Sequence, residues 1–167
     1  MQKRTYGRVM INCIVAVEKN QGIGFKGQMP WPHLKGDMSW FKQMTTNQVV
    51  IMGSTTYDSL GKSLPNRINV VISRKRVLGD HTFDDCGSAL DYCSVEYPDK
   101  DIFIIGGSAI YEQYLDIVDR FYVTEIDAEY ECDKHFNLTY VKNHFTKVKE
   151  HATFNEPIKY TIKEYNL

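Results

Sequence analysis

The sequence predicts an α/β fold: a mostly parallel central sheet with flanking helices and an antiparallel hairpin at its C-terminal edge. Two observations predict this class. Strand-like and helix-like stretches alternate through the first two thirds of the chain, which implies right-handed β-α-β crossovers. The strand-like runs VVIM and IFII are apolar throughout, as expected when helices cover both faces of a parallel sheet. At 167 residues the chain has the length of one domain, which we place at residues 1–167.

Each predicted element follows from a local pattern. Apolar runs predict strands at 9–17, 49–52, 68–72, 102–105, 121–124, 145–149 and 160–165. Helices are predicted at 35–45, 55–60, 88–95 and 108–115, and the last third of the chain contains no strong helix pattern. The two final strands are separated by Asn155-Glu156-Pro157, which predicts the edge hairpin.

Charge and hydropathy exclude several classes of protein. The net charge of -1 and the pI near 6.5 argue against a general nucleic-acid binder, which is usually basic. No apolar run approaches the ~20 residues of a membrane span. The run at 9–17 follows Lys3, Arg4 and Arg8, as in a short signal peptide, but Asn12 interrupts it and Glu18 ends it. A buried first strand is therefore the better interpretation.

The four cysteines are Cys13, Cys86, Cys93 and Cys132, and no two of them form a C-x-x-C pair. This spacing argues against zinc ribbons and thioredoxin-like redox chemistry. The histidines show no metal-ligand spacing either, so we predict no metal site. Reduced thiols in a cytoplasmic protein are the simplest interpretation.

The stretch at 23–42, IGFKGQMPWPHLKGDMSWFK, holds the most informative residue. A Gly-rich loop leads into a helix on which Leu34, Asp37, Met38 and Phe41 follow the i, i+3, i+4, i+7 spacing of a buried stripe. A buried carboxylate is costly unless something pairs with it, and no Lys or Arg lies one turn away on this stripe. A bound ligand with N–H donors is therefore a candidate partner for Asp37.

Two strand-to-helix junctions carry small residues. In VVIMGSTTY, Gly53 ends a strand and Ser54-Thr55-Thr56 opens a helix; in IFIIGGSAIY, Gly106-Gly107 precedes Ser108. Unpaired N–H groups at a helix start attract anions, so two such junctions on neighbouring strands predict a pyrophosphate site. The alternative, that Gly and Ser merely cap the helices, stays open. The full G-x-G-x-x-G fingerprint is absent, which argues against a Rossmann dehydrogenase.

A basic cluster, Arg74-Lys75-Arg76, follows the third strand and Ser73. Such a run is usually a solvated surface. At the carboxyl end of a strand it is also placed to hold an extra phosphate, which would select NADP over NAD because Arg pairs with phosphate in a fork geometry.

Together these segments resemble the dihydrofolate reductase family. The similar pieces, in order, are IVAV, GIGFKGQMPW, LKGDMSWFK, VVIMGSTTYDSLGKSLPNRINVVISR, IIGGSAIYEQYL and FYVTEIDAEYECDKHF. The resemblance covers nearly the whole chain, closely from residue 9 to about residue 136 and loosely in the tail. The order and spacing of the pieces are far more specific than any single motif.

The resemblance implies NADPH-dependent reduction of 7,8-dihydrofolate to 5,6,7,8-tetrahydrofolate, in support of one-carbon metabolism and thymidylate synthesis. A hydride passes from nicotinamide C4 to pterin C6, and N5 gains a proton that water brings. We expect a cytoplasmic monomer whose partners are dihydrofolate and NADPH, with no nucleic acid and no membrane among them.

The resemblance also implies roles for individual residues. The expected catalytic residues are Asp37, which accepts hydrogen bonds from the pterin amino group and ring nitrogen, and Thr124, which donates to that carboxylate. Arg67 matches the Arg that pairs with the α-carboxylate of the glutamate tail. The other expected substrate contacts are Ile14, Val15, Met38, Phe41, Leu60, Leu64, Ile105 and Tyr111. The expected cofactor contacts are Ala16, Ile23, Gly24, Met29, Trp31, Gly53, Ser54, Thr55, Thr56, Ser73, Arg74, Gly106, Gly107, Ser108, Ala109 and Ile110. Met29 and Trp31 belong to a mobile loop that closes over the nicotinamide, and the Gly106–Gly107 peptide is expected to be cis.

The chain departs from the family pattern in three places. The spacing from Trp31 to Asp37 is one residue longer than in the common bacterial form and resembles the vertebrate-type WPPL segment, in which the acid is Glu. Ser54 and Ala109 stand where basic residues are common, so two phosphate contacts are missing. Lys62 and the basic cluster 74–76 are candidates to compensate.

Two alternative functions share part of this pattern. A same-fold reductase of riboflavin biosynthesis would keep the cofactor junctions but not the set Asp37, Thr124 and Arg67. A non-catalytic nucleotide-binding copy would bind the cofactor without turnover, although all the expected polar residues are present here.

Overall fold

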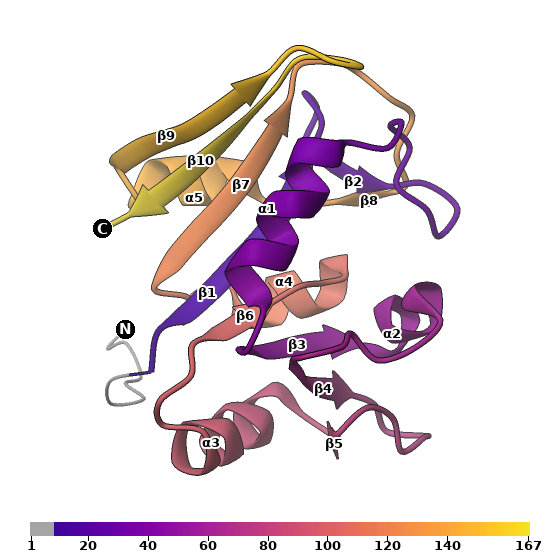
Figure 1. Cartoon of the computed structure of the whole chain (residues 1–167), viewed down its shortest axis with the longest axis vertical. Coiled ribbons are helices and arrows are strands. Elements are labelled where there is room, and N and C mark those ends of the chain that lie inside the picture. The colour runs from indigo at the N-terminus through magenta and orange to yellow at the C-terminus, as the bar shows by residue number, and fades with distance from the viewer. Residues whose placement is uncertain (1–8) are drawn as a thin grey trace. The chain divides into compact units, whose positions relative to one another are not determined.

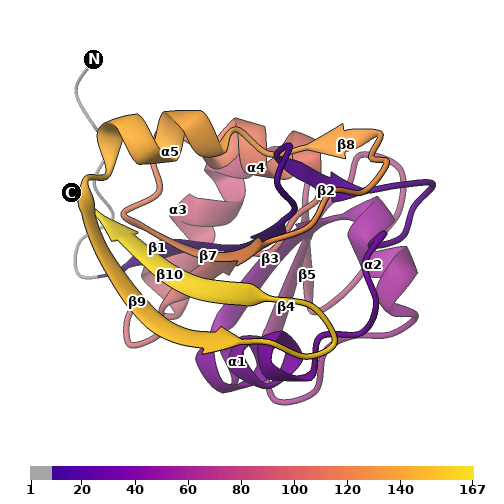
Figure 2. The same ribbon diagram turned by 90° about the horizontal axis from the view of Figure 1, so that it is seen from above.

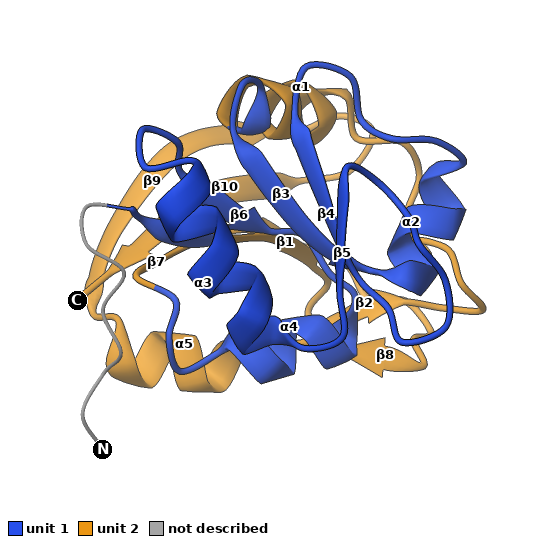
Figure 3. Cartoon of the chain, turned by 90° about the horizontal axis from the view of Figure 1, so that it is seen from below, with its two compact units in different colours: residues 1–12, 45–118 blue, residues 13–44, 119–167 orange. Residues whose placement is uncertain are grey.

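The computed structural model describes residues 9–167, which fall into two compact units (Figure 3). Of the described residues, unit 1 comprises 9–12 and 45–118, and unit 2 comprises 13–44 and 119–167. Lys3, Arg4 and Arg8, which raised the question of a signal peptide, lie outside the described residues.

Unit 1 contains a parallel sheet. Its strands are β3 (Val49–Gly53), β4 (Ile68–Ile72), β5 (His81–Phe83) and β6 (Ile102–Ile104), in the order β5-β4-β3-β6. Helix α2 (Ser54–Leu60) follows β3, α3 (Cys86–Glu96) follows β5, and α4 (Ser108–Tyr114) follows β6. Helices α3 and α4 lie on the same side of these strands (Figure 3). The VVIM run of β3 is wholly buried, which is why it lacks the alternation of a half-exposed strand.

Unit 2 is built on antiparallel pairing. Strand β10 (Tyr160–Asn166) runs antiparallel to both β7 (Arg120–Ile126) and β9 (Lys147–Phe154), and β1 (Ile11–Val17), of which residues 13–17 belong to this unit, neighbours β7. Helix α1 (Lys35–Thr45), which lies in this unit except for Thr45, covers one face of β7, β10 and β9, and α5 (Leu138–His144) covers the other (Figure 2). A small ribbon pairs β2 (Gly22–Gly24) with β8 (Lys134–His135) (Figure 1).

A cluster of side chains fixes the start of α1 within unit 2. Trp31 and Leu34 immediately precede the helix, and they pack with Ile126 of β7 and Tyr160 of β10. All four are at most 8% exposed. Because the apolar anchors come just before Lys35, the packing determines where the helix begins, and so where Asp37 stands.

The predicted fold class is confirmed. Parallel strands alternate with helices in unit 1, and the chain ends in the predicted antiparallel hairpin, β9–β10, whose connection contains Asn155-Glu156-Pro157. The strand runs at 9–17, 49–52, 68–72, 102–105, 121–124 and 160–165 all correspond to observed strands within a few residues.

One helix and three short strands were missed, and one strand was misplaced. The last third does contain a helix, α5, capped by Asn137, whose side chain accepts a hydrogen bond from the N–H of Tyr140. Leu138 and Val141 are buried and Phe145 ends the helix, so the apolar residues assigned to a strand at 145–149 partly belong to this helix and β9 begins at Lys147. The short strands β2, β5 and β8 also carry too few residues for a pattern to predict. Among residues 9–167, no helix is both long and apolar enough to cross a membrane.

Candidate active site

Asp37 and Thr124 meet inside unit 2. Asp37 lies in the first turn of α1, and Thr124, which is 3% exposed, lies in the middle of β7. The Thr124 hydroxyl Oγ1 donates to Asp37 Oδ1 over 2.5 Å. This is the hydrogen bond expected from the sequence. Burial raises the pKa of the Asp37 carboxyl, and the hydrogen bond from Thr124 opposes that rise only in part.

No cation in the described part of the chain pairs with Asp37. Its carboxylate has one protein donor, the Thr124 hydroxyl, and no charged side chain is among the causes of its pKa shift. A carboxylate offers about four lone-pair sites, so most of its accepting capacity is left for another molecule. Asp37 is therefore a half-buried anion that can accept further hydrogen bonds.

The helix stripe around Asp37 is less buried than its spacing predicts. Leu34 is 3% exposed, but Met38 is 44% exposed and Phe41 is half-buried. In α1 itself, only Thr45 is buried. An acid flanked by a half-buried aromatic ring and an exposed thioether is typical of a ligand-binding face rather than of a closed core.

Unit 2 contains the following sequence-predicted site residues: Ile14, Val15, Ala16, Ile23, Gly24, Met29, Trp31, Asp37, Met38, Phe41 and Thr124. Unit 1 contains the others: Gly53, Ser54, Thr55, Thr56, Leu60, Leu64, Arg67, Ser73, Arg74, Ile105, Gly106, Gly107, Ser108, Ala109, Ile110 and Tyr111.

Arg67 is held by two hydrogen bonds within unit 1. Its Nε donates to the Pro65 carbonyl over 2.9 Å, and its Nη1 donates to Thr45 Oγ1 over 3.1 Å. Partial burial lowers the pKa of the guanidinium, and no carboxylate of the described residues pairs with it. Thr45 was not predicted; its only signal in the sequence is its place at the end of α1. The two bonds fix the guanidinium plane and leave its remaining N–H groups for an anion.

The two glycine junctions lie side by side in unit 1, as expected. Strands β3 and β6 are neighbours, and the N–H of Gly53 donates to the Gly106 carbonyl over 2.9 Å. The Gly106–Gly107 peptide is cis, as the family resemblance implied. A Cβ at Gly106, whose φ is +116°, would lie 3.2 Å from the Tyr111 ring, so this position favours glycine for both space and conformation.

Helices α2 and α4 start without side-chain caps. Their N-cap residues are Gly53 and Gly107, and neither helix start receives a side-chain hydrogen bond. Thr56 of α2 stands close to the second junction, because its Oγ1 lies 3.6 Å from where a Cβ on Gly107 would be. The glycines therefore do cap these helices, as the alternative interpretation holds, but no serine side chain does. Because the two helix starts follow neighbouring strands, their first backbone N–H groups are candidates to bind one anion.

The basic cluster is partly engaged. Arg76 makes a two-pronged ion pair with Asp58 of α2, with N–O distances of 2.7 and 3.2 Å, and its backbone N–H donates to Ser73 Oγ. Arg74 and Lys75 are exposed. The structure separates Arg76 from Arg74 and Lys75, because Asp58 already neutralises Arg76.

Glu18 has a structural role that the sequence did not reveal. Its side chain is 2% exposed and accepts three backbone hydrogen bonds: from Asn20 over 2.8 Å, from Gly22 over 2.7 Å and from Tyr130 over 3.1 Å. It thereby joins the start of the 20–31 loop to the segment after β7. In the sequence, Glu18 only marks the end of an apolar run. In the same loop, Met29 is 57% exposed and Trp31 is 8% exposed.

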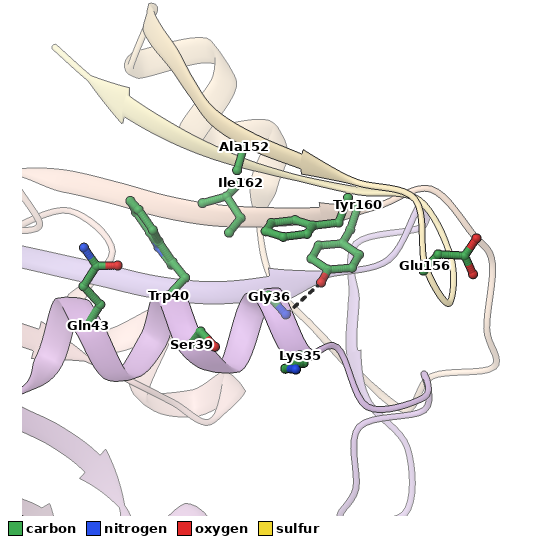
Figure 4. A pocket seen from close by; sticks show the side chains of 10 residues that line it. Lys35, Gly36, Ser39, Trp40, Gln43, Ala152, Glu156, Tyr160 and Ile162 are labelled. Carbon is green, nitrogen blue, oxygen red and sulfur yellow. Dashed lines mark hydrogen bonds between the residues drawn. The ribbon is translucent and has the colours of Figure 1, made fainter.

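A hollow of about 490 Å³ lies between α1 and the β9–β10 hairpin (Figure 4). Trp40, Phe154, Tyr160 and Ile162 form its apolar walls, and none of the sequence-predicted site residues lines it. Among residues 9–167, no group of three or more His, Cys, Asp or Glu side chains is arranged to hold a metal ion.

Comparison with known proteins gives a consistent result. The family model described as Dihydrofolate reductase matches residues 10–167. A Dihydrofolate reductase of Bacillus subtilis (strain 168) is 37% identical over 133 residues, which is 76% of this chain and 75% of that protein. One from Haemophilus influenzae is 39% identical over 127 residues, covering 75% and 77% of the two chains. Dihydrofolate reductase type 9 of Escherichia coli is 37% identical over 155 residues, covering 87% and 86%.

Proposed function

The chain belongs to the dihydrofolate reductase family, and we propose that it reduces 7,8-dihydrofolate to 5,6,7,8-tetrahydrofolate with NADPH as the hydride donor. The observation that carries this proposal is the half-buried Asp37 carboxylate, which accepts a hydrogen bond from Thr124 and has no cationic partner among the described residues. The product would support one-carbon metabolism and thymidylate synthesis in the cytoplasm, with the protein acting as a monomer.

Asp37 orients the substrate. The 2-amino group and the adjacent ring nitrogen of a pterin offer two parallel N–H donors, which match the two oxygens of a carboxylate. Thr124 occupies one lone pair of Oδ1 and so fixes the rotation of the carboxylate about its own bond. Asp37 stabilises positive charge that develops on the ring as it is reduced and protonated. We assign it an orienting and electrostatic role, with water bringing the proton to N5.

Arg67 binds the far end of the substrate. The bonds to Thr45 and Pro65 hold its guanidinium, so its remaining N–H groups can grip the α-carboxylate of the glutamate tail in a forked geometry. The apolar side chains Leu60 and Leu64, one 39% exposed and the other half-buried, are proposed to contact the benzoyl ring. Since this end of the substrate does not react, its contacts contribute mainly to binding.

The glycine junctions fit a nicotinamide dinucleotide. Two helix starts without side-chain caps, Gly53 and Gly107, lie on neighbouring strands, and any side chain at Gly106 would fill the space beside Tyr111. These backbone N–H groups would hold the pyrophosphate. When bound, the cofactor supplies the hydride for pterin C6. Met29 and Trp31, on the 20–31 loop, are proposed to exclude water from that reaction.

The preference for NADPH over NADH is proposed to depend on Arg74 and Lys75, with Lys62 as a further candidate. Ser54 and Ala109 supply no charge, and Arg76 is already paired with Asp58. We therefore expect Arg74→Gln to lower the ratio of kcat/KM for NADPH to that for NADH by roughly tenfold, as loss of one charge-assisted phosphate contact predicts. Arg76→Gln is the matched control and should change the ratio much less. Equal efficiency of the unmodified protein with NADPH and NADH would contradict the proposed preference.

One assay tests the proposed activity directly. The protein is mixed with NADPH and dihydrofolate, and oxidation of the cofactor is followed by its absorbance. Steady oxidation that requires dihydrofolate supports the proposal. Cofactor binding without turnover would instead identify a non-catalytic copy. Turnover only with a pyrimidine substrate of riboflavin biosynthesis would identify the other reductase.

A further inference from the structure

The first turn of α1 is held by a hydroxyl group from β10. The N–H of Gly36, the second residue of the helix, donates to the Tyr160 hydroxyl over 3.0 Å (Figure 4). The first N–H groups of a helix have no partner within it, and here the N–H of Met38 is already bonded to the Leu34 carbonyl. Tyr160, which is 1% exposed, therefore supplies a cap that the sequence before the helix does not provide.

Gly36 allows the hairpin to approach the helix closely. A Cβ at this position would lie 2.5 Å from the Phe154 ring and 2.7 Å from the Tyr160 hydroxyl oxygen. Phe154 and Tyr160 are register partners on β9 and β10, and their rings stack at 4.9 Å with an angle of 15°. The hairpin thus presents a rigid aromatic pair to the backbone of the helix, one residue before Asp37.

We propose that Tyr160 is a positioning residue for the Asp37 carboxylate, acting through the Gly36 N–H. Two neighbouring strands then hold two consecutive residues of one helical turn. Strand β10 holds the backbone of Gly36 through Tyr160, and β7 holds the side chain of Asp37 through Thr124. The strands are themselves in fixed register, with Tyr160 opposite Ile126 and Ile162 opposite Thr124. The role of Asp37 in binding the pterin rests on the proposed function; its positioning does not.

Removing the hydroxyl has a predictable effect on the acid. Without Tyr160 Oη the Gly36 N–H loses its partner, the first turn loosens and water gains access to Asp37. Burial holds the pKa of Asp37 up, so greater exposure lowers it toward its ordinary value. Lys35 and Glu156 are the charged side chains that line the hollow between α1 and the hairpin. In unit 2, the group that faces the Asp37 carboxylate directly is the uncharged Thr124 hydroxyl.

The test compares Tyr160→Phe with Tyr165→Phe. Tyr165 is a matched control because it lies on the same strand, is 3% exposed, and donates its hydroxyl to Glu125 rather than to α1. Both variants should lower the midpoint of thermal unfolding. Only Tyr160→Phe should lower the pKa of Asp37, measured by NMR of its carboxyl carbon in the ligand-free protein. It should also reduce kcat/KM for dihydrofolate by roughly fivefold, as loss of a helix cap predicts.

A second variant approaches the same contact from the helix. Gly36→Ala forces the first turn away from Phe154 and Tyr160, so it should move the Asp37 titration in the same direction. If Tyr160→Phe leaves the Asp37 titration where Tyr165→Phe leaves it, the proposal is overturned. Because the NMR titration needs no substrate, it decides the positioning role even if the protein fails to reduce dihydrofolate, an outcome that would refute only the proposed function.

Discussion

Replacing Asp37 by Asn tests the central residue of the site. The change keeps size and shape, and the Oδ1 atom of the new amide still accepts the hydrogen bond from Thr124, so the local structure should persist. It removes the charge and places an NH₂ group against one of the two pterin donors. Losing a charge-assisted hydrogen bond costs about 1.5–3 kcal/mol, and leaving a donor unpaired adds about 1–3 kcal/mol. At about 1.4 kcal/mol per tenfold, kcat/KM should fall by on the order of 10² to 10⁴.

The assay is steady-state oxidation of NADPH at saturating cofactor and varied dihydrofolate, at neutral pH. Direct binding of NADPH to the variant, followed by fluorescence or calorimetry, should match the unmodified protein, because Asp37 is not among the residues proposed to contact the cofactor. A variant that retained near-native rates would show that Asp37 does not carry the proposed role. A variant that lost NADPH binding as well would show a general structural defect.

Asp37→Asn should stabilise the folded protein even though it lowers the activity. Burial raises the pKa of Asp37 in the folded protein above the unfolded value, so its contribution to stability is complete below the unfolded pKa and is lost as the pH rises through the folded pKa. The amide that replaces the carboxyl group in Asp37→Asn does not titrate. The free energy of unfolding of this variant, measured by urea denaturation, should therefore exceed that of the unmodified protein by an amount that grows from acid to neutral pH. A constant difference across that range would show that the carboxylate is not destabilised by burial.

Two further substitutions test other residues of the site and its loop. Arg67→Lys replaces a fixed fork by a single ammonium group. The KM for dihydrofolate should therefore rise by roughly tenfold to a hundredfold, with little change in kcat. A pterin substrate without the glutamate tail should give the same KM with both proteins. Glu18→Gln presents an NH₂ group to at least one of three backbone N–H donors. The free energy of unfolding, measured by urea denaturation, should therefore fall by about 1–3 kcal/mol. Glu131→Gln is the control and should have almost no effect, because its exposed side chain accepts none of these bonds.

The parts of the fold that the sequence predicted are those determined by local pattern. The strand runs of unit 1 were identified because full burial leaves them apolar at every position. Helix α5 was missed although Asn137, Leu138 and Val141 form a cap followed by a helical spacing, because it spans only seven residues and runs into an apolar stretch that also suits a strand. Short elements of this kind depend on tertiary packing more than on their own pattern.

Most of the contacts that define the site join residues far apart in the sequence, so local patterns could not predict them. The Thr124–Asp37 bond spans 87 positions in the sequence and the Gly36–Tyr160 bond spans 124. No spacing rule relates such residues; the family resemblance supplied Thr124, and nothing supplied Tyr160, Thr45 or Glu18. Conversely, Asp58 shows how an apparently uniform basic run divides once the fold brings a carboxylate to one of its members.

Asp37 is the most informative residue of the sequence because it places an acid in an otherwise apolar helix stripe. An Asn at this position would keep an acceptor for Thr124 at a lower cost in stability, because the carboxylate is partly desolvated beside a single neutral donor. The chain nonetheless holds this acid from two sides, with a hydroxyl on its oxygen and a second hydroxyl on the preceding N–H. The bond to Gly36 also caps the helix, but neither bond removes the cost of burying the Asp37 charge. The two bonds keep the Asp37 carboxylate in one orientation. We infer that a ligand that donates hydrogen bonds to this carboxylate offsets the cost of its burial, so that the fixed orientation contributes to catalysis.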